Sequence, residues 1–296
     1  MKKGPFFWAQ LAVTVLASVF LVAPVLYTVM VALSKNAFVG IGSGLTSEWI
    51  EKVFSLYGDT IVRGLLISLG TLGCCVVLGV PCAYFLVKSG KSKISMALEE
   101  SLVLPLSVPG LAIGLGMLLS WGETDWFRKS SFFIMAGHVI FCLPFMVRSV
   151  AAVLRMIPLS RYEEAASSMG VGFAGRFAGI VVPLTAPGIL AGSLQTIALS
   201  LGEFNITWML QTPFTRTLPV GLADSYASMR LEIGSAYTLV FLLLIIPLLV
   251  LAQKLPGMIS RKFGERGETA GPGEAPEPPS SPSASPTPAA PPLSGV

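Results

Sequence analysis

Six long runs of this sequence contain no Asp, Glu, Lys or Arg, and most of their residues are apolar. A helix that crosses a bilayer needs about 20 such residues, and each run can supply that length. Backbone amides inside a bilayer must be paired within the chain, so helices are expected, and no strand-like alternation suggests a barrel. Only 12% of the residues are charged, whereas soluble domains carry about a quarter. We therefore predict an all-α membrane protein with six transmembrane helices, at residues 4–34, 64–87, 101–121, 130–147, 177–202 and 233–253.

The basic residues predict the side of the membrane that each loop faces. The first run begins like a signal peptide, but its apolar stretch is about twice the usual secretory length, so we interpret it as a retained span. If Lys2 and Lys3 are cytoplasmic, most of the other Lys and Arg residues fall on the same side, as the positive-inside rule requires. Both termini and the polar segment 160–183 are then predicted to be cytoplasmic.

Three regions are expected along the chain. Residues 1–60 hold the first transmembrane helix and an outer loop, and residues 61–255 form a core with the other five helices and the segment 160–183. Residues 264–296 are rich in Pro, Ser and Ala and have almost no large apolar side chains. Such a composition cannot offset the entropy lost on ordering, so this cytoplasmic tail is predicted to be disordered.

The segment 160–183 predicts a short polar helix between the fourth and fifth spans. Ser160 and Glu163 have the spacing of a capping box at a helix start. The helical repeat places Tyr162, Ala165, Ala166 and Met169 on one face, and Gly170 and Gly172 are suited to end the helix. An acidic first turn is repelled by anionic lipid, so a protein partner is favoured over the membrane surface.

The same segment resembles a known family. It reads EAASSMG, then nine residues, then IVVP, which is similar to the signature loop of the membrane subunits of bacterial ATP-binding-cassette importers; Val182 stands where the family usually has leucine. The resemblance implies a type I importer permease architecture in a bacterial inner membrane, with a coupling helix that docks on an ATPase. The residues that it implies for ATPase coupling are Glu163, Glu164, Ala165, Ala166, Met169, Gly170, Ile180 and Pro183.

The resemblance also implies partners. The chain offers no nucleotide site of its own, because the tripeptide GKS at residues 90–92 lacks the preceding glycine of a phosphate-binding loop; Phe85 occupies that position. We therefore expect no enzyme activity and no cofactor in this chain, with ATP and Mg held by a separate dimeric ATPase subunit. A second permease subunit, identical or related, and an extracytoplasmic solute-binding protein complete the expected assembly. The basic residues follow the membrane topology, so no nucleic-acid partner is predicted.

Polar residues in the fifth run and directly after it are candidates for the translocation path. Glu203 and Asn205 lie near its expected outer end, and Gln195 and Thr196 precede them by one to two turns. A carboxylate near a membrane is costly unless it meets water or a partner. Glu203 therefore either lines the path or forms a helix-end carboxylate that is solvated or paired with Arg216.

The substrate is less constrained than the architecture. The stretch from SLGEFNITWML to TRTLPVGLADSY looks most like permeases of the polyamine (spermidine and putrescine) group, and a carboxylate suits a cation. Ferric iron, thiamine, an aminophosphonate or an oxyanion are alternatives within the same architecture. A secondary transporter is a different class, but it needs ion-coupling carboxylates or broken helices at mid-depth, and no acidic residue is expected there.

Several other features have plain structural interpretations. The four cysteines lie within predicted spans without metal-ligand spacing, and no metal site is expected. The only histidine, His138, is interpreted as a packing residue. Two glycine pairs at four-residue spacing, Gly110 with Gly114 and Gly188 with Gly192, permit close helix packing, although such pairs are common in apolar helices.

Overall fold

The computed structural model describes residues 4–90, 92–247 and 250, and in these ranges the chain is helical, with a single isolated bridge between Ser34 and Leu45. The all-α prediction is therefore confirmed for the described residues. The predicted tail at 264–296 and the end of the last predicted span lie outside them. The long helices are α1 (Pro5–Ala32), α2 (Glu48–Lys88), α3 (Lys93–Ser107), α4 (Gly110–Trp121), α6 (Ser131–Leu154) and α10 (Ala186–Gly202).

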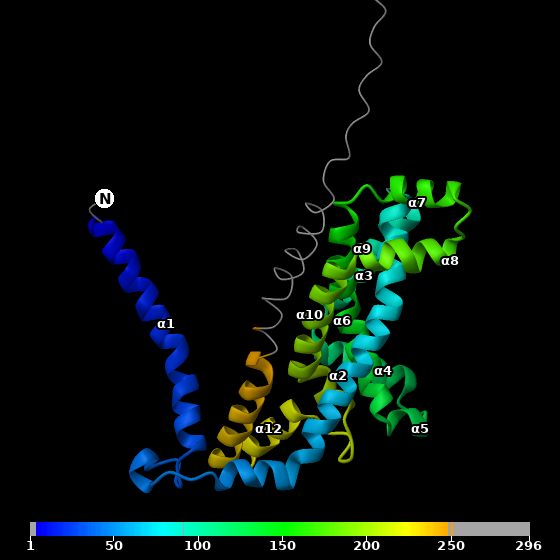
Figure 1. Cartoon of the computed structure of the whole chain (residues 1–296). Helices are drawn as coiled ribbons and strands as arrows, with labels where there is room; N and C mark the ends of the chain where they lie inside the picture. Colours follow the sequence, from blue (N-terminus) through cyan, green and yellow to red (C-terminus); the bar gives the residue numbers. More distant parts are fainter. Residues whose placement is uncertain (1–3, 91, 248–249, 251–296) are drawn as a thin grey trace, which may run out of the picture.

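Shorter elements connect these helices. They are η1 (Gly40–Ser43), α5 (Asp125–Arg128), α7 (Leu159–Ser168), α8 (Phe173–Arg176), the π-helical η2 (Phe177–Val181), α9 (Val182–Leu184), α11 (Asn205–Leu210) and α12 (Leu218–Ala227). A further apolar helix covers Leu231–Pro247. In Figure 1, α7 and α8 lie at the same end of the molecule as the start of α1, whereas α5 and α12 lie at the opposite end. The loops that the charges assign to one side therefore lie together.

Three of the described helices, α1, α2 and α6, are each long and apolar enough to cross a membrane. The number rises to five if each of two bent pairs counts as one span: α3 with α4, bent by 106°, and the segment Phe173–Leu184 with α10, bent by 70°. The predicted third and fifth spans are therefore broken helices, not continuous ones. The third breaks because Pro109 forces Val108 into an extended conformation, with φ −99° and ψ 132°.

Helix α2 is much longer than the predicted second span. It has 41 residues and starts at Glu48, within the segment expected to be an outer loop. The boundary that the sequence places at residue 60 therefore falls inside one continuous helix. Glu48 and Glu51 lie in its first turn, where acidic side chains interact favourably with the helix dipole.

Helices α2, α6 and α10 form the centre of the bundle. Buried apolar side chains of α2 and α6, among them Cys75, Val80 and Met146, form one cluster, and the partly buried Ile189 and Leu199 of α10 pack against it. A Cβ atom added at Gly188 would lie 2.7 Å from the backbone oxygen of Ser149, so α10 approaches α6 as closely as only glycine permits. The packing role predicted for the pair Gly188 and Gly192 is confirmed.

Candidate functional site

The candidate site is the loop from α7 to α9, which corresponds to the segment 160–183. Helix α7 begins at Leu159, directly after Pro158, and no side chain caps it. The predicted capping box is therefore wrong: Ser160 lies within the helix, and the carboxylate of Glu163 binds elsewhere. Leu159 and Glu163, four residues apart, are both buried, so they lie on the face of α7 that is turned toward the bundle.

Glu163 is bound to the end of α2. Tyr84 donates its hydroxyl hydrogen to Oε1 of Glu163 at 2.6 Å, and Nζ of Lys88 donates to Oε2 at 3.0 Å. Lys88 Nζ also lies 2.6 Å from the Tyr84 oxygen, so the three side chains form a closed triangle. Glu163 is only 7% exposed. We call this group of Glu163, Tyr84 and Lys88 the anchor.

The anchor favours the charged form of Glu163. Burial by itself raises the pKa of this carboxyl, but the hydrogen bonds from Tyr84 and Lys88 outweigh burial and hold the pKa below its ordinary value. A charged carboxylate accepts stronger hydrogen bonds than a neutral one. The anchor is therefore a charge-assisted joint between α7 and α2.

Aromatic packing extends this joint to the following turns. The ring of Tyr84 meets the ring of Phe177 edge to face, with centroids 5.5 Å apart, and lies 6.1 Å from that of Phe173. Phe173 and Phe177 stack on each other at 6.0 Å. Such pairs add to the stabilisation from burial, so α8 and η2 are held against α2 together with α7.

Helix α7 ends as the sequence predicts at Gly170, with one correction. Gly170 has φ +80°, a conformation that glycine adopts without strain. The amides of Gly170 and Val171 donate to the carbonyls of Ser167 and Ala166, a Schellman arrangement. Gly172 does not end α7; it is extended and precedes α8.

The outer surface of α7 carries most of the remaining predicted residues. Tyr162, Ala165 and Met169 are exposed, and Met169 is 76% exposed. Ala166 is buried with Leu159 and Glu163, so the predicted four-residue face is wrong in this member. The buried residues that face the bundle recur every three to four positions, which is typical of a helix.

Of the other residues predicted for ATPase coupling, Glu164 lies in α7, and Ile180 and Pro183 lie in the following elements η2 and α9. Glu164 is exposed, and its side chain makes no hydrogen bond or ion pair with another described residue. Ile180 is half-buried within η2, and Pro183 is exposed in α9, where the chain turns into α10.

The four residues predicted for the translocation path differ in burial. Gln195 and Asn205 are exposed, whereas Thr196 and Glu203 are buried within the chain. Arg216 pairs with Asp224, with Nη1 and Oδ2 3.2 Å apart. The alternative in which Glu203 pairs with Arg216 is therefore wrong, and so is the solvated alternative, because Glu203 is only 9% exposed.

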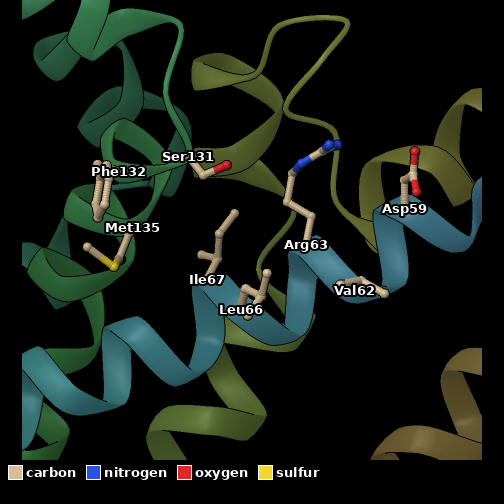
Figure 2. Close-up of a pocket in the computed structure, with 8 residues that line it drawn as sticks. All are labelled: Asp59, Val62, Arg63, Leu66, Ile67, Ser131, Phe132 and Met135. Carbon is tan, nitrogen blue, oxygen red and sulfur yellow. The ribbon is translucent and has the colours of Figure 1, made fainter.

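A hollow of about 460 Å³ lies where α2 meets the start of α6, and Figure 2 shows its lining. It combines a carboxylate and a guanidinium from α2 with apolar side chains of both helices. Nη1 of Arg63 also donates to the backbone oxygen of Arg216 at 3.3 Å, which ties α2 to the segment before α12. The lining residues are Asp59, Val62, Arg63, Leu66, Ile67, Ser131, Phe132 and Met135.

Within the described ranges, no three His, Cys, Asp or Glu residues are grouped so that they could hold a metal ion. All four cysteines are free thiols. The sequence analysis did not identify Tyr84 and Lys88 as functional residues. Their four-residue spacing at a span end is a weak signal, because a partner 75 residues away cannot be inferred from it.

The described helices define a helical bundle with several helices long and apolar enough to cross a membrane. The chain belongs to the family described as the binding-protein-dependent transport system inner membrane component, whose model matches residues 75–262, more than half of the sequence. The resemblance to importer permeases is thereby confirmed. This family is the permease component of ATP-binding-cassette transporters, not the catalytic one.

Two curated relatives and one solved structure illustrate the match. The chain is 26% identical over 244 residues to the putrescine transport system permease protein PotI of Escherichia coli K12, covering 78% of this chain and 85% of that protein. It is 30% identical over 184 residues to the molybdenum transport system permease protein ModB of the same strain, covering 57% and 80%. The fold resembles a bacterial ABC transporter involved in the import of the acidic polysaccharide alginate, with a TM-score of 0.64 at 14% identity, covering 86% of this chain and 96% of that one.

Proposed function

We propose that the chain is the membrane-spanning subunit of an ATP-driven importer, with six spans and both termini in the cytoplasm. It forms the translocation path together with a second permease, and it binds a separate ATPase dimer that holds ATP and Mg. An extracytoplasmic binding protein delivers the solute. The observation that carries this proposal is the α7 loop, because one face of α7 is fastened to the bundle while the other is exposed.

Motion of a docked ATPase reaches the spans through α2. The ATPase contacts the exposed side of α7, including Glu164, Ala165 and Met169, and Gly170 sets the turn that follows. Because the anchor fastens α7 to Tyr84 and Lys88, a displacement of α7 pulls on the end of α2. Helix α2 is unbroken over 41 residues, about 60 Å at 1.5 Å per residue. Arg63 precedes Tyr84 by about 30 Å along this helix, so α2 transmits the displacement to the hollow around Arg63 (Figure 2).

The isolation of α1 supports a second permease subunit. Only 11% of its most apolar window is buried, against 33% for α2 and 50% for α6. Figure 1 shows α1 leaving the bundle near residue 32 and diverging from it toward its start. A helix that is exposed over most of its length is suited to pack against the spans of a neighbouring permease.

We propose a small organic cation, such as a polyamine, as the substrate. The support is the match to PotI, which extends over 78% of this chain and is named for putrescine transport. The match to ModB covers 57% and makes an oxyanion the alternative outcome of the test.

Co-purification tests the importer function. In the complex isolated from membranes, Glu164→Arg should abolish retention of the ATPase, because it reverses the charge of an exposed side chain on α7 that forms no hydrogen bond or ion pair with another described residue. The matched control is Glu123→Arg, which places the same change on an exposed residue at the opposite end. Retention of the ATPase by the Glu164 variant, or uptake that continues when the ATPase cannot hydrolyse ATP, would contradict the proposal.

Uptake by intact cells tests the substrate. Radiolabelled putrescine should accumulate in cells that express the complete system, and excess unlabelled molybdate should not compete. If molybdate accumulates in an ATP-dependent manner and putrescine does not, the substrate proposal is wrong while the importer function stands.

A further inference from the structure

The bend of the third predicted span touches the junction between α10 and α11. Helix α4 begins at Gly110, directly after the bend of the third span, and α11 begins at Asn205, directly after the end of α10. A Cβ atom added at Gly110 would lie 3.1 Å from Cβ of Asn205 and 3.2 Å from Oε1 of Glu203. One turn later, a Cβ atom at Gly114 would lie 2.7 Å from Cβ of Met209. The pair Gly110 and Gly114 therefore allows α4 and α11 to pack in close contact.

Glu203 holds the break between α10 and α11. Its backbone is extended, with φ −73° and ψ 113°, although no proline follows to impose that conformation. Its Oε1 accepts the amide hydrogen of Ile206 at 2.7 Å, in a buried position. The first amides of a helix lack partners within it, so this carboxylate supplies the acceptor that lets α11 start inside the bundle.

His138 spans the same break from α6. Its Nδ1 lies 2.8 Å from Oγ of Ser200 in α10, and its Nε2 lies 2.8 Å from Oγ1 of Thr207 in α11. A neutral imidazole has one donor and one acceptor, and the two hydroxyls can serve as the complementary groups. The ring is 1% exposed. It therefore joins the half-helices on either side of Glu203.

We propose that Glu203 and His138 are positioning residues that make the break between α10 and α11 a rigid joint. The joint binds α4, α6, α10 and α11 into one body that moves as a unit during transport. Glu203 acts in it as a hydrogen-bond acceptor and does not bind the solute. Glu203 is buried and already binds the backbone, and it forms no ion pair with a described residue.

An acceptor role and a ligand role make different demands on this side chain. A helix cap requires an oxygen with lone pairs, which the glutamine amide also provides. Attraction of a cationic solute requires the negative charge. Glu203→Gln therefore separates the two roles, and Glu203→Leu removes both.

The test combines hydrogen exchange with uptake. Hydrogen–deuterium exchange is measured by mass spectrometry on the complex in lipid nanodiscs, for the peptide that covers residues 203–211. We expect slow exchange in the wild type and in Glu203→Gln, and exchange at least tenfold faster in Glu203→Leu and in His138→Leu. His138→Gln, which keeps a donor and an acceptor, should recover part of the protection. Trapping the ATPase with ATP and vanadate should leave the wild-type exchange of this peptide unchanged.

The second measurement is uptake of radiolabelled putrescine, and only this arm rests on the proposed substrate. Uptake should persist in Glu203→Gln and fall at least tenfold in Glu203→Leu. Loss of uptake in Glu203→Gln with wild-type exchange would assign the charge to the solute and overturn the proposal. Unchanged exchange in Glu203→Leu, or faster exchange in the trapped wild type, would overturn it as well. If the wild type takes up no putrescine, the substrate proposal fails, and the exchange measurements still decide the joint.

Discussion

Glu163 and Glu203 are both buried carboxylates, at 7% and 9% exposure, but they stabilise different kinds of contact. Glu163 meets a cation and a phenol from another helix and joins two elements that are far apart in the sequence. Glu203 meets a backbone amide three residues later and shapes its own segment. The anchor depends on charge, whereas the joint depends on an acceptor oxygen and close backbone packing. Replacement of glutamate by glutamine is therefore expected to impair the anchor and to leave the joint intact.

The largest effect is expected when the charge of the anchor is removed. Glu163→Gln leaves Lys88 without its counter-charge and weakens both hydrogen bonds, so α7 no longer holds the end of α2 firmly. Solute-stimulated ATP hydrolysis by the reconstituted complex should fall at least tenfold. The matched control is Glu99→Gln, which breaks the ion pair with Arg155 at the same end of the bundle; both partners are more than half exposed there, and such pairs contribute little. Equal losses in the two variants would mean that the anchor has no special role.

The packing of the joint should tolerate no added methyl group at Gly114. Gly114→Ala forces Met209 and α11 to move, because the new Cβ would lie 2.7 Å from the Cβ of Met209. Overpacking of this kind costs about 1–3 kcal/mol. Thermal unfolding in detergent should show a lower transition temperature for Gly114→Ala than for the wild type. The transition temperature of Gly116→Ala should equal that of the wild type, since a Cβ at Gly116 meets nothing within 4 Å. If both variants unfold alike, α4 and α11 are not in close contact.

A smaller effect is expected at the turn after α7. Gly170→Ala places a side chain at φ +80°, which costs about 1–2 kcal/mol for an L-residue. Gly172→Ala has ordinary φ and open space around its Cβ, so it should be tolerated. The amount of ATPase retained on the purified permease measures the difference. A stronger defect in Gly172→Ala than in Gly170→Ala would contradict the observed helix end.

The smallest effect is a pH dependence of the anchor. The pKa of Glu163 lies below its ordinary value of 4.5, so its stabilising contribution is complete above that pH and is lost as the pH falls through the folded-state pKa. The difference in unfolding temperature between the wild type and Glu163→Gln should therefore be constant from about pH 8 to pH 5 and should shrink only below about pH 4.5. A difference that already disappears near pH 6 would mean that the carboxylate is not held in its charged form.

Local chemistry in the sequence predicted several elements correctly. The apolar runs indicated the helical bundle, and glycine at position 170 indicated the end of α7, because both depend on residues close together in the chain. The capping box failed because a capping side chain has to remain available, and the carboxylate of Glu163 binds partners on α2 instead. Such competition between local and distant partners is not visible in a motif.

The joint could not be predicted from the sequence for a different reason. Pro109 could have indicated the break in the third span, but no proline follows Glu203 to indicate the break between α10 and α11. Its existence depends on His138, which lies 62 and 69 residues from its two partners. The glycine pair at positions 110 and 114 was visible in the sequence, but only the structure shows that it packs against α11.

The central claim is that α7 binds a cytoplasmic ATPase with its exposed side. Met169 is suited to test it, because its side chain is 76% exposed and belongs to that side. Met169→Cys, in a variant without the four native cysteines, is treated in inverted membrane vesicles with a thiol-to-amine cross-linker. The account predicts a cross-linked product that contains a polypeptide with a phosphate-binding loop, and its loss when Glu164→Arg is added. Labelling of this cysteine by an impermeant reagent from the extracellular side only, with no ATPase product, would contradict the account.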